Sequence, residues 1–576
     1  MAREQKITTS STAEYFSKNL QQVGFSSQTK AVLTTLKESV DNSLDACEEA
    51  GIVPEIFVEV ERAGAGTTKN ADRIRVSVAD NGPGIEADDL AKVFGEYLAS
   101  SKFGRGRCTR GQQGIGISAA TTWAQLTSAT GAKVISKTKA MRKAVSATVE
   151  VDIKNNKGVL KNRETIDWDR PQGTFVEFVF DGRVQINGDA GVLSYLLGTA
   201  LVNPHLTLHY KLPGQDAADA KTDNKAENKA DKKTGYITVE RVSTQVPEIP
   251  EAIEPHPHTM KLGEFIAHSH LYGRVKVSAW LKKGFSRISD SVIDEMVKAH
   301  TGVTKALLEK NLDQIGEKEF QVLFTTLQNL QLKAPPTSSV LSIGEDSMAK
   351  SIQRLGKVDY FSVVSRKPTI CDFKPVQVEV AIARLEQRGG DADDPVQVLR
   401  FANRVPLQFD KSACAIVQAI TSVNWRSYGL GQPKDSLPQG PYIMAVSVVS
   451  PFIKFKNASK ETIDASDELV EEIRRTLMQA GQKLSRYIRA ESKAADLEEK
   501  IRYIEQFGPI LVEGLARISN AKEDRKQKAT DGLMKLLGRD ATAAGKEVAE
   551  AEKKLEAHKA KQSVREEKLA AEVEGE

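Results

Sequence analysis

Hydrophobic and polar positions follow two different periods along the first 211 residues of this chain. From about Thr29 to Glu49, apolar residues recur at intervals of three and four, which predicts an amphipathic helix. The segments IFVEVE at 56–61 and RIRVSVAD at 73–80 alternate instead or are rich in β-branched residues, which predicts strands. Helical and strand-like segments continue to alternate up to residue 211, so we expect an α/β domain here.

The pattern changes after this region. Residues 214–235, GQDAADAKTDNKAENKADKKTG, are polar and lack apolar periodicity, which is typical of a disordered linker or a surface insertion. A helical pattern follows over 263–331, with turn-like breaks at GFS, TGV and QIGEKEF. Short strand patterns such as VQVEVAIARL and YIMAVSVV return between 357 and 450, which predicts a second α/β unit.

From Asp464 onward the sequence is helical in pattern and highly charged. One face of this segment is apolar, which predicts a long amphipathic helix, and it consists of Leu469, Ile473, Leu477, Leu484 and Ile488. The final stretch, from Lys522 to Glu576, is rich in Lys, Glu and Ala. It is compatible with a coiled-coil hairpin, a partner-docking arm or a solvated tail.

Length and composition restrict the class of protein. The 576 residues, 40% of them hydrophobic, suffice for several cores, and no stretch approaches the roughly 20 apolar residues of a membrane span. The N-terminus lacks an apolar signal-peptide core, so we expect an intracellular protein. The four cysteines contain no C-x-x-C pair, which argues against a disulfide framework or a zinc ribbon. With 81 basic and 77 acidic residues the formal charge is only +4, so any DNA contact must be local.

The first motif with chemical meaning is ESVDNSLDA at 38–46, within the predicted helix. Glu38 and Asn42 are four residues apart and therefore share one helix face. Asn42 can offer an amide oxygen to Mg²⁺, and Glu38 can orient and deprotonate a water molecule. The alternative is a solvated helix face without function.

Two glycine-rich segments follow. In DNGPGI at 80–85, Asp80 ends a strand and can accept a hydrogen bond from an exocyclic amine such as that of adenine, while Gly82 and Gly84 permit close approach of a ligand. GQQGIGIS at 111–118 opens an apolar helix whose N-terminal amides can bind phosphate. Taken singly, each is also explained as an ordinary turn.

In this order and spacing the three motifs resemble the N box and the two glycine boxes of the GHKL ATPases, a superfamily of gyrase-type topoisomerases, MutL repair proteins, chaperones and histidine kinases. The resemblance implies ATP and Mg²⁺ as cofactors and a Bergerat α/β sandwich. It implies Glu38 as general base, Asn42 as Mg²⁺ ligand and Asp80 as adenine contact. The phosphate loop that it implies comprises Gly111, Gln112, Gln113, Gly114, Ile115, Gly116, Ile117 and Ser118.

Two further segments match this superfamily. YLASSKFGRGRCTRG at 97–111 is similar to the flexible lid, in which Ser101 and Lys102 match residues that contact nucleotide. Thr174, in GTFVEFVF, resembles the residue that hydrogen-bonds near the adenine.

The remainder of the chain resembles one branch, the B subunits of type VI topoisomerases. EIPEAIEPHPHTMKLGEF at 248–265 and FSRISDSVIDEMVKAH at 285–300 are similar to their helix-two-turns-helix insert. Further matching segments lie at 336–348, 398–409, 423–430 and 448–463. By this resemblance Lys460, in NASKETI, is the transducer lysine that reaches the ATP γ-phosphate, and a compact ammonium suits such a contact. The alternative is a surface lysine like its neighbours Lys454 and Lys456.

The resemblance implies an α/β multidomain chain. We expect a GHKL ATP-binding domain at 1–235 with the polar linker 214–235, a helix-two-turns-helix domain at 236–345, a transducer of ribosomal S5-like fold at 346–463, a helical stalk at 464–521 that leads to the A subunit, and a charged C-terminal arm at 522–576.

It also implies an ATP-hydrolysing component of a type IIB DNA topoisomerase. Such a component dimerises through its ATPase domain on ATP, traps double-stranded DNA and drives strand passage and relaxation of supercoils. GEDSMAK at 344–350 and DADD at 391–394 resemble the acidic cluster of a cleavage site only loosely, so we expect cleavage on a separate topoisomerase VI A subunit, within an A2B2 heterotetramer. A cytoplasmic, nucleoid-associated location without membrane contact follows.

Several points stay open at this stage. The candidate DNA-contacting residues are Lys282, Lys283, Arg287, Arg404 and Arg426. The histidine pairs His256/His258 and His268/His270 lack a carboxylate or cysteine at ligand spacing, which favours packing roles over a metal site. A MutL-like repair clamp and a chaperone-like ATP-gated binding protein are the alternative functions.

Overall fold

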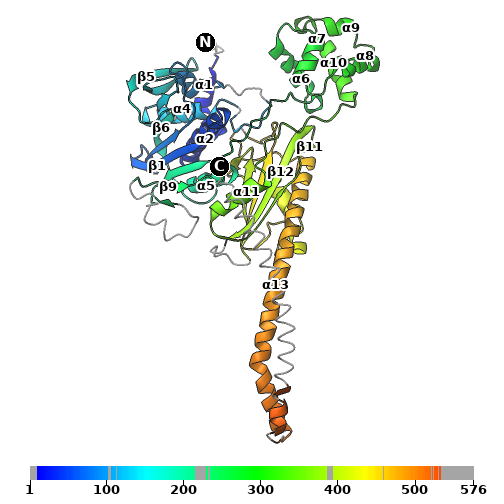
Figure 1. The fold of residues 1–576 in the computed structure, drawn as a ribbon. Coiled ribbons are helices and arrows are strands. Elements are labelled where there is room, and N and C mark those ends of the chain that lie inside the picture. The colour runs from blue at the N-terminus through cyan, green and yellow to red at the C-terminus, as the bar shows by residue number, and fades with distance from the viewer. Residues whose placement is uncertain are drawn as a thin grey trace, which may run out of the picture.

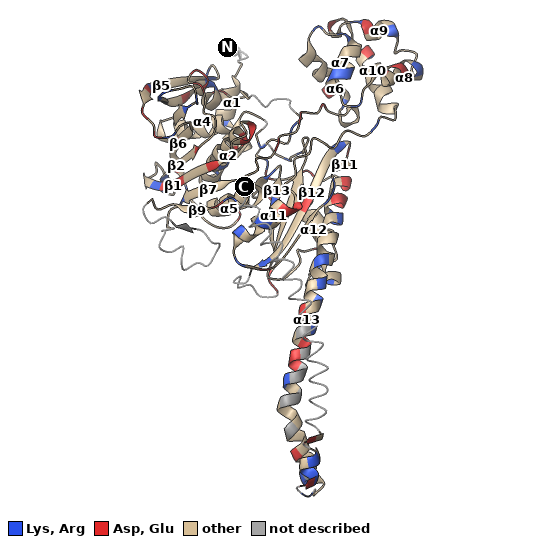
Figure 2. Cartoon of the chain, in the orientation of Figure 1, with Lys and Arg blue, Asp and Glu red and all other residues tan. Residues whose placement is uncertain are grey.

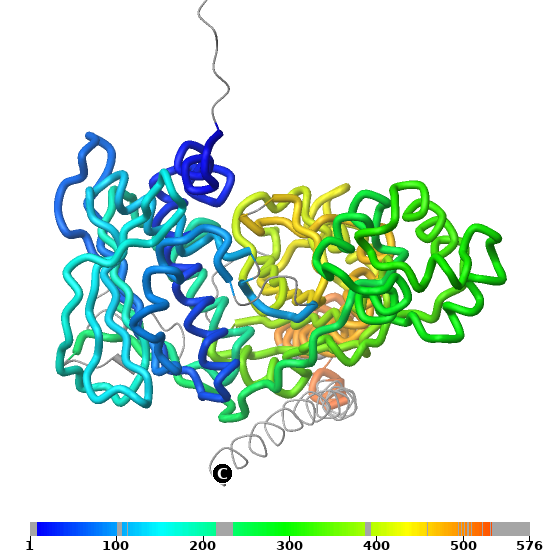
Figure 3. The backbone as a smooth tube through the Cα atoms, turned by 90° about the horizontal axis from the view of Figure 1, so that it is seen from above, coloured from blue at the N-terminus to red at the C-terminus, as the bar shows by residue number. Residues whose placement is uncertain are grey.

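The computed structural model describes residues 9–100, 106–111, 113–214, 229–230, 234–385, 393–457, 459–520, 522, 524–529 and 531–532. The described chain forms two β-sheet units, a helical module beyond the second unit, and a long helix that runs away from that unit (Figure 1). Seen from above, the helices of the first unit lie on the side that faces the second unit (Figure 3).

The first unit is built on a nine-stranded mixed sheet in the order β5-β4-β3-β6-β2-β1-β7-β9-β8. In β1, the alternation noticed in the sequence places Ile56, Val58 and Val60 in the core. The strands are β1 (Glu55–Ala65), β2 (Asp72–Asp80), β3 (Ala132–Lys137), β4 (Ala144–Asp152), β5 (Lys157–Ile166), β6 (Gly173–Gly182), β7 (Thr207–Lys211), β8 (Lys229–Ala230) and β9 (Ile237–Val239). The short β8 lies within the polar segment 214–235, most of which is outside the described residues.

Helix α2 is the element that positions the site. Its leucines and valines at three- and four-residue spacing, such as Leu36, Val40 and Leu44, are fully buried against the sheet, and Ser27 caps its first turn. The opposite face, with Glu38 and Asn42, stays accessible. The helices of this unit are α1 (Thr12–Lys18), η1 (Leu20–Val23), α2 (Gln28–Glu49), α3 (Leu90–Gly95), α4 (Gly116–Ser128) and α5 (Val192–Val202).

The helical module contains no strand among its described residues. Its core is aromatic, and the Phe265 ring contacts those of Trp280, Phe285 and Phe320. The module comprises η3 (Pro257–Thr259), α6 (Leu262–Ser269), η4 (His270–Tyr272), α7 (Val277–Gly284), α8 (Asp290–Ala299), α9 (Lys305–Glu309), η5 (Leu312–Gln314) and α10 (Glu317–Asn329).

The second unit contains a six-stranded sheet in the order β10-β12-β15-β13-β14, with β11 paired to β12. Both faces of this sheet are covered, so its central strand β15 is buried throughout. The elements are α11 (Glu345–Ile352), η6 (Gln353–Leu355), β10 (Val358–Ser365), β11 (Thr369–Cys371), β12 (Lys374–Leu385), β13 (Gln397–Ala402), β14 (Val405–Leu407), α12 (Ala415–Ser422), η7 (Trp425–Tyr428) and β15 (Tyr442–Val449).

Helix α13 (Asp467–Ile518) starts on this sheet and continues well beyond it (Figure 1). Of the predicted apolar face, Ile473, Leu477 and Leu484 are fully buried, and Leu469 and Ile488 pack beside them, which confirms the predicted helix. Beyond the sheet, both acidic and basic residues lie along the helix (Figure 2). No described helix is both long and apolar enough to cross a membrane.

The four cysteines and the pair His256/His258 have packing roles. All four cysteines, Cys47, Cys108, Cys371 and Cys414, are buried free thiols. His256 stacks on Phe373 of the second unit with ring centroids 5.0 Å apart, and His258 meets the same ring edge-on at 4.8 Å. The contact joins the helical module to the second unit.

Candidate active site

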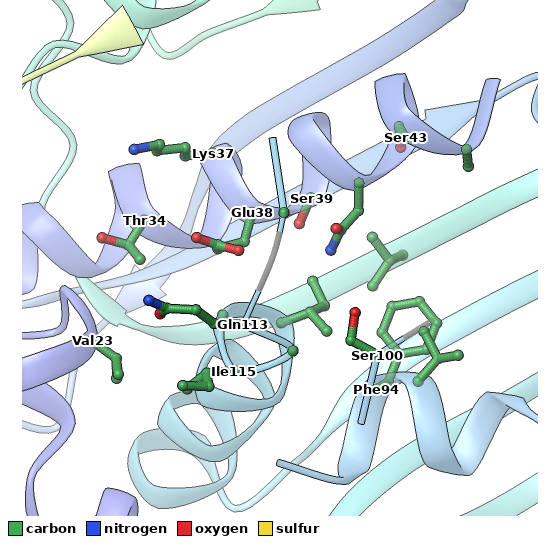
Figure 4. A pocket seen from close by; sticks show the side chains of 18 of the residues that line it. Val23, Thr34, Lys37, Glu38, Ser39, Ser43, Phe94, Ser100, Gln113 and Ile115 are labelled. Atoms are coloured by element: carbon green, nitrogen blue, oxygen red, sulfur yellow. The ribbon is translucent and has the colours of Figure 1, made fainter. Parts of the chain in front are cut away.

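A cavity of about 330 Å³ opens between α2, the start of α4 and the second unit. Its volume lies in the range of small-molecule sites, roughly 300–1,000 Å³. Figure 4 shows Glu38 projecting from α2 toward Gln113 and Ile115 at the start of α4, with Phe94 and Ser100 at the other end of the cavity.

Asp80 lies at the end of β2 and is 5% exposed. Its Oδ2 accepts a hydrogen bond from Ser43 Oγ at 2.7 Å, and its Oδ1 accepts from the backbone N–H groups of Gly82 at 3.0 Å and Thr174 at 3.1 Å. Burial raises the pKa of Asp80, while these three donors favour its charged form. A buried carboxylate held in this way is a suitable acceptor for an exocyclic amine.

The glycines allow close approach of backbone segments. Gly84 has φ +75°, and a Cβ there would lie 2.2 Å from the Lys137 carbonyl oxygen. At Gly116 a Cβ would lie 1.9 Å from Glu38 Oε2, so any larger residue there would displace the Glu38 carboxylate. The N-cap of α4, Ile115, has no side-chain oxygen to cap the first-turn N–H groups, which suits anion binding at this helix end.

The second unit completes the cavity. A loop presents Ser459, Lys460 and Glu461, and β14 is followed by Gln408 and Phe409. Lys30 of α2 pairs with Glu461 at 3.0 Å and lies 4.4 Å from the centre of the Phe409 ring, which anchors this loop to α2.

Lys460 points into the site from this loop. Its Nζ donates to the backbone carbonyl of Arg110 at 2.8 Å. Burial lowers the pKa of Lys460, and the negative charge of Glu38 opposes that shift. A lysine and the predicted general base therefore interact across one cavity.

Most of the residues predicted for the site come together here. Twelve of them line the cavity, and they are Glu38, Asn42, Asp80, Gly84, Gly111, Gln113, Gly114, Ile115, Gly116, Ile117, Thr174 and Lys460. Gly82 does not line it and acts instead through its N–H on Asp80. Ser118 is buried, and its hydroxyl donates to the Glu96 carbonyl at 2.8 Å. Ser101, Lys102 and Gln112 lie outside the described residues.

Sequence reasoning missed a buried ionic cluster beside the cavity. Glu48 of α2 forms ion pairs with Arg110 and Arg404, both at 2.7 Å, and Arg110 also binds Asp45 at 2.7 Å. Arg404 was predicted as a candidate DNA contact. This prediction is wrong, because the side chain is only 3% exposed and forms an ion pair with Glu48. The three-residue spacing of Asn42, Asp45 and Glu48 places these side chains on one helix face, which could have indicated a polar cluster. It does not indicate which arginines pair with them.

Two family models match the chain. The histidine kinase-, DNA gyrase B- and HSP90-like ATPase model matches residues 28–181, and the model of the topoisomerase VI B subunit transducer matches residues 335–500. The protein named as the B subunit of type 2 DNA topoisomerase 6 in Methanococcoides burtonii is 34% identical over 508 residues, which cover 88% of this chain and 76% of that protein. The Pyrococcus furiosus protein of the same name is 30% identical, with 94% and 96% covered.

The chain belongs to the family of type 2 DNA topoisomerase 6 B subunits. As a member of this family it is the B subunit of an ATP-dependent type II DNA topoisomerase. The matched ATPase region carries α2, Asp80 and the glycine-rich segments, and the matched transducer region carries Lys460. The cavity of this topoisomerase 6 B subunit thus lies between its ATPase and its transducer.

The solved structures that align with this chain are more distant in sequence. The ATPase region of Saccharomyces cerevisiae topoisomerase II aligns with a TM-score of 0.39 at 11% identity and covers 85% of this chain and 100% of that one. The gyrase B subunit of Myxococcus xanthus aligns with a TM-score of 0.39 at 13% identity, covering 83% and 96%.

Proposed function

We propose that this chain is the ATP-driven gate of a two-subunit topoisomerase, in which Glu38 and Lys460 act on the same nucleotide. The observation that supports this most directly is that both residues line one cavity although they come from different units. A nucleotide bound there contacts the ATPase and the transducer together, so its hydrolysis changes their relation.

In the proposed reaction, ATP is the substrate and water is the nucleophile. Asp80 accepts a hydrogen bond from the adenine amine beside Thr174, and the segment from Gly111 to Ile117 holds the phosphates. Glu38 takes a proton from the water as its oxygen bonds to the γ-phosphorus, and the bond from phosphorus to the ADP oxygen breaks. Ser101, Lys102 and Gln112 are proposed further contacts to the nucleotide.

Mg²⁺ is a proposed cofactor. The amide of Asn42 faces the cavity one turn from Glu38 and close to Gly111, whose Cβ position lies 3.5 Å from Asn42 Oδ1. One hard oxygen from the protein fits Mg²⁺, which usually completes its coordination with phosphate oxygens and water. When bound, the ion neutralises charge on the phosphates.

Lys460 is the proposed sensor of the γ-phosphate. Its ammonium now binds the Arg110 carbonyl, a neutral acceptor, and a phosphate oxygen offers a stronger, charged one. Exchange of this partner on ATP binding, and its reversal after hydrolysis, would move the transducer loop relative to α2.

We also propose the wider assembly. The domain boundaries 1–235, 236–345, 346–463, 464–521 and 522–576 describe an ATPase, a helix-two-turns-helix insert, a transducer, a stalk and an arm. Two chains would close on a DNA duplex when ATP binds, and the stalk would join a DNA-cutting A subunit in an A2B2 complex in the cytoplasm, at the nucleoid. Among the proposed DNA contacts, Lys282, Lys283, Arg287 and Arg426 are exposed.

The test is relaxation of a supercoiled plasmid by this chain alone, by the DNA-cutting partner alone and by their mixture, each with and without ATP. We expect relaxation only by the mixture with ATP. ATP hydrolysis without relaxation in any mixture would refute the gate function and favour a MutL-like repair clamp.

A further inference from the structure

Glu48 lies between two arginines that come from different units of the chain. Arg110 directly precedes the glycine-rich segment, and its Nη1 and Nη2 bind Glu48 Oε2 at 3.0 Å and Oε1 at 2.7 Å. Arg404 of the transducer binds the same carboxylate through Nη1 at 3.0 Å and Nη2 at 2.7 Å. Each guanidinium is therefore held by two parallel hydrogen bonds, which fix its orientation as well as its position.

The cluster is sealed from solvent. Glu48, Arg110 and Arg404 are each at most 4% exposed, and Asp45 balances the second positive charge. His205 Nε2 lies 2.8 Å from Glu48 Oε1, and burial lowers the His205 pKa, so a neutral ring donates this hydrogen bond. Burial favours the neutral form of Glu48, yet the two arginines hold its pKa well below the usual value.

The transducer holds Arg404 rigidly. The residue occupies the tight turn between β13 and β14, where Asn403 has φ +48° and Arg404 has φ +62°. The Asn403 side chain donates to the Ser450 carbonyl and accepts from the Ser450 N–H, both at 2.9 Å, so the turn is tied to the end of β15. A non-glycine pair with positive φ is strained, and the ion pair to Glu48 offsets that strain.

Arg110 is thus held by the transducer at two points. Its carbonyl accepts from Lys460, and its side chain meets Arg404 through Glu48. A buried charge cannot lose its partner without a large cost, so a shift of the Arg110 backbone must either break the cluster or move Arg404 with it. A break would leave buried charges without partners, which favours movement of Arg404.

A second buried transducer arginine offers a contrast. Arg354 donates to the backbone carbonyls of Ala200 and Leu206 at 2.7 Å each, and so holds the end of α5. It touches neither Glu48 nor the glycine-rich segment in the described structure. Arg354 joins the same two units, but it reaches Arg110 only indirectly, through Asn203, whose carbonyl accepts from Arg354 Nη1 at 3.3 Å and whose side-chain oxygen accepts from Arg110.

We propose that Glu48 is a positioning residue that passes displacement of Arg110, at the entrance to the phosphate loop, to the transducer through Arg404. The proposal rests on the proposed ATP site, because only a nucleotide at that site would displace Arg110. Lys460 then detects the γ-phosphate, and the Arg110–Glu48–Arg404 cluster carries the resulting movement into the second sheet.

The test compares the full-length wild-type chain with Arg404→Lys, which keeps the charge and loses the two-point contact, and with the matched control Arg354→Lys. Binding of a non-hydrolysable ATP analogue with Mg²⁺ is measured by calorimetry. Hydrogen exchange of β13, β14 and β15 is measured with and without the analogue. If Arg404→Lys does not fold, Glu48→Asp, which shortens the carboxylate's reach, takes its place.

We expect the analogue to bind all folded variants with affinities within about threefold of each other, and to change transducer exchange in the wild type and Arg354→Lys. In Arg404→Lys this change should shrink at least about fivefold, the lower end of usual coupling between sites. An undiminished exchange response in Arg404→Lys, or an equal loss in Arg354→Lys, would overturn the proposal while leaving the ATP site intact. If the wild type does not bind the analogue, the proposed ATP site is refuted, and the proposed positioning role of Glu48 is refuted with it.

Discussion

Glu38 is the proposed general base of the site. Its carboxylate borders Gly116 and faces the cavity, so Glu38→Gln keeps the shape and removes the base. We expect the ATP hydrolysis rate to fall about 10²- to 10⁴-fold, the usual contribution of a general base, while the Kd for an ATP analogue changes little. Steady-state hydrolysis and calorimetry on the same preparation measure both quantities.

The matched control is Glu164→Gln on β5, an exposed glutamate remote from the cavity. It should hydrolyse ATP at the wild-type rate. Hydrolysis by Glu38→Gln at that same rate would exclude Glu38 as the base.

At the residue scale, the sequence predicted those residues whose partners are close in the chain. Glu38 and Asn42 share a helix face by spacing alone, and Asp80 and Gly82 are two residues apart. Glu48 and Arg404 are 356 positions apart, and no local pattern distinguishes their pairing from ordinary surface charges. The same limit explains why Arg404 was assigned to a DNA contact although it is buried.

Among the elements, the contact between η3 and the β11–β12 turn should depend on pH. Burial, with the nearby charges of His258 and Arg287, lowers the pKa of His256 to about 4, from 6.5 in a free chain. Between these values the unfolded chain binds more protons than the folded one, so stability rises with pH and is lost as pH falls below 6.5. The loss should be on the order of 2 kcal/mol by pH 4.5.

Thermal unfolding at pH 7 and pH 5 measures this effect. His256→Asn keeps an acceptor for the His258 N–H and removes the ionisable ring, so its unfolding temperature should fall less between the two pH values than that of the wild type. His270→Asn, at an exposed histidine of the same module, should behave as the wild type does. An unchanged pH response in His256→Asn would show that other groups cause it.

Periodicity predicted helices and strands well where one face is buried. The apolar face of α13 and the alternation in β1 are direct consequences of one-sided burial. The pairing of β8 with β9 was not predicted, because two residues in a polar segment carry no period. Hydrophobic periodicity also does not predict which residues attach α13 to the sheet, such as Arg384 of β12, which binds Glu491.

At the scale of the whole molecule, the attachment of α13 to β12 would carry movement of the second sheet into the proposed stalk. Arg384 of β12 binds Asp359 at 2.7 Å and, on α13, Glu491 at 2.7 Å and the Tyr487 hydroxyl at 2.6 Å. Arg384→Met should lower the free energy of unfolding by about 2–3 kcal/mol, since it removes hydrogen bonds to charged groups. ATP hydrolysis should persist, while plasmid relaxation per ATP consumed by the complex with the DNA-cutting partner should fall about fivefold or more.

Arg475→Met is the control, because Arg475 lies on the exposed face of α13 and pairs only with Glu471 among the described contacts. It should leave both measurements unchanged. Equal relaxation per ATP in Arg384→Met and the wild type would show that the stalk moves without this attachment.

The division of one cavity between two units also bears on inhibition. A compound confined to the Asp80 end of the cavity would contact only the ATPase. One that extends to Phe409 and Lys460 would contact both units and hold the transducer in a fixed position relative to the ATPase. Such a compound would arrest motion as well as compete with ATP. Resistance to it would then arise at Phe409, where a substitution leaves every predicted adenine contact in place.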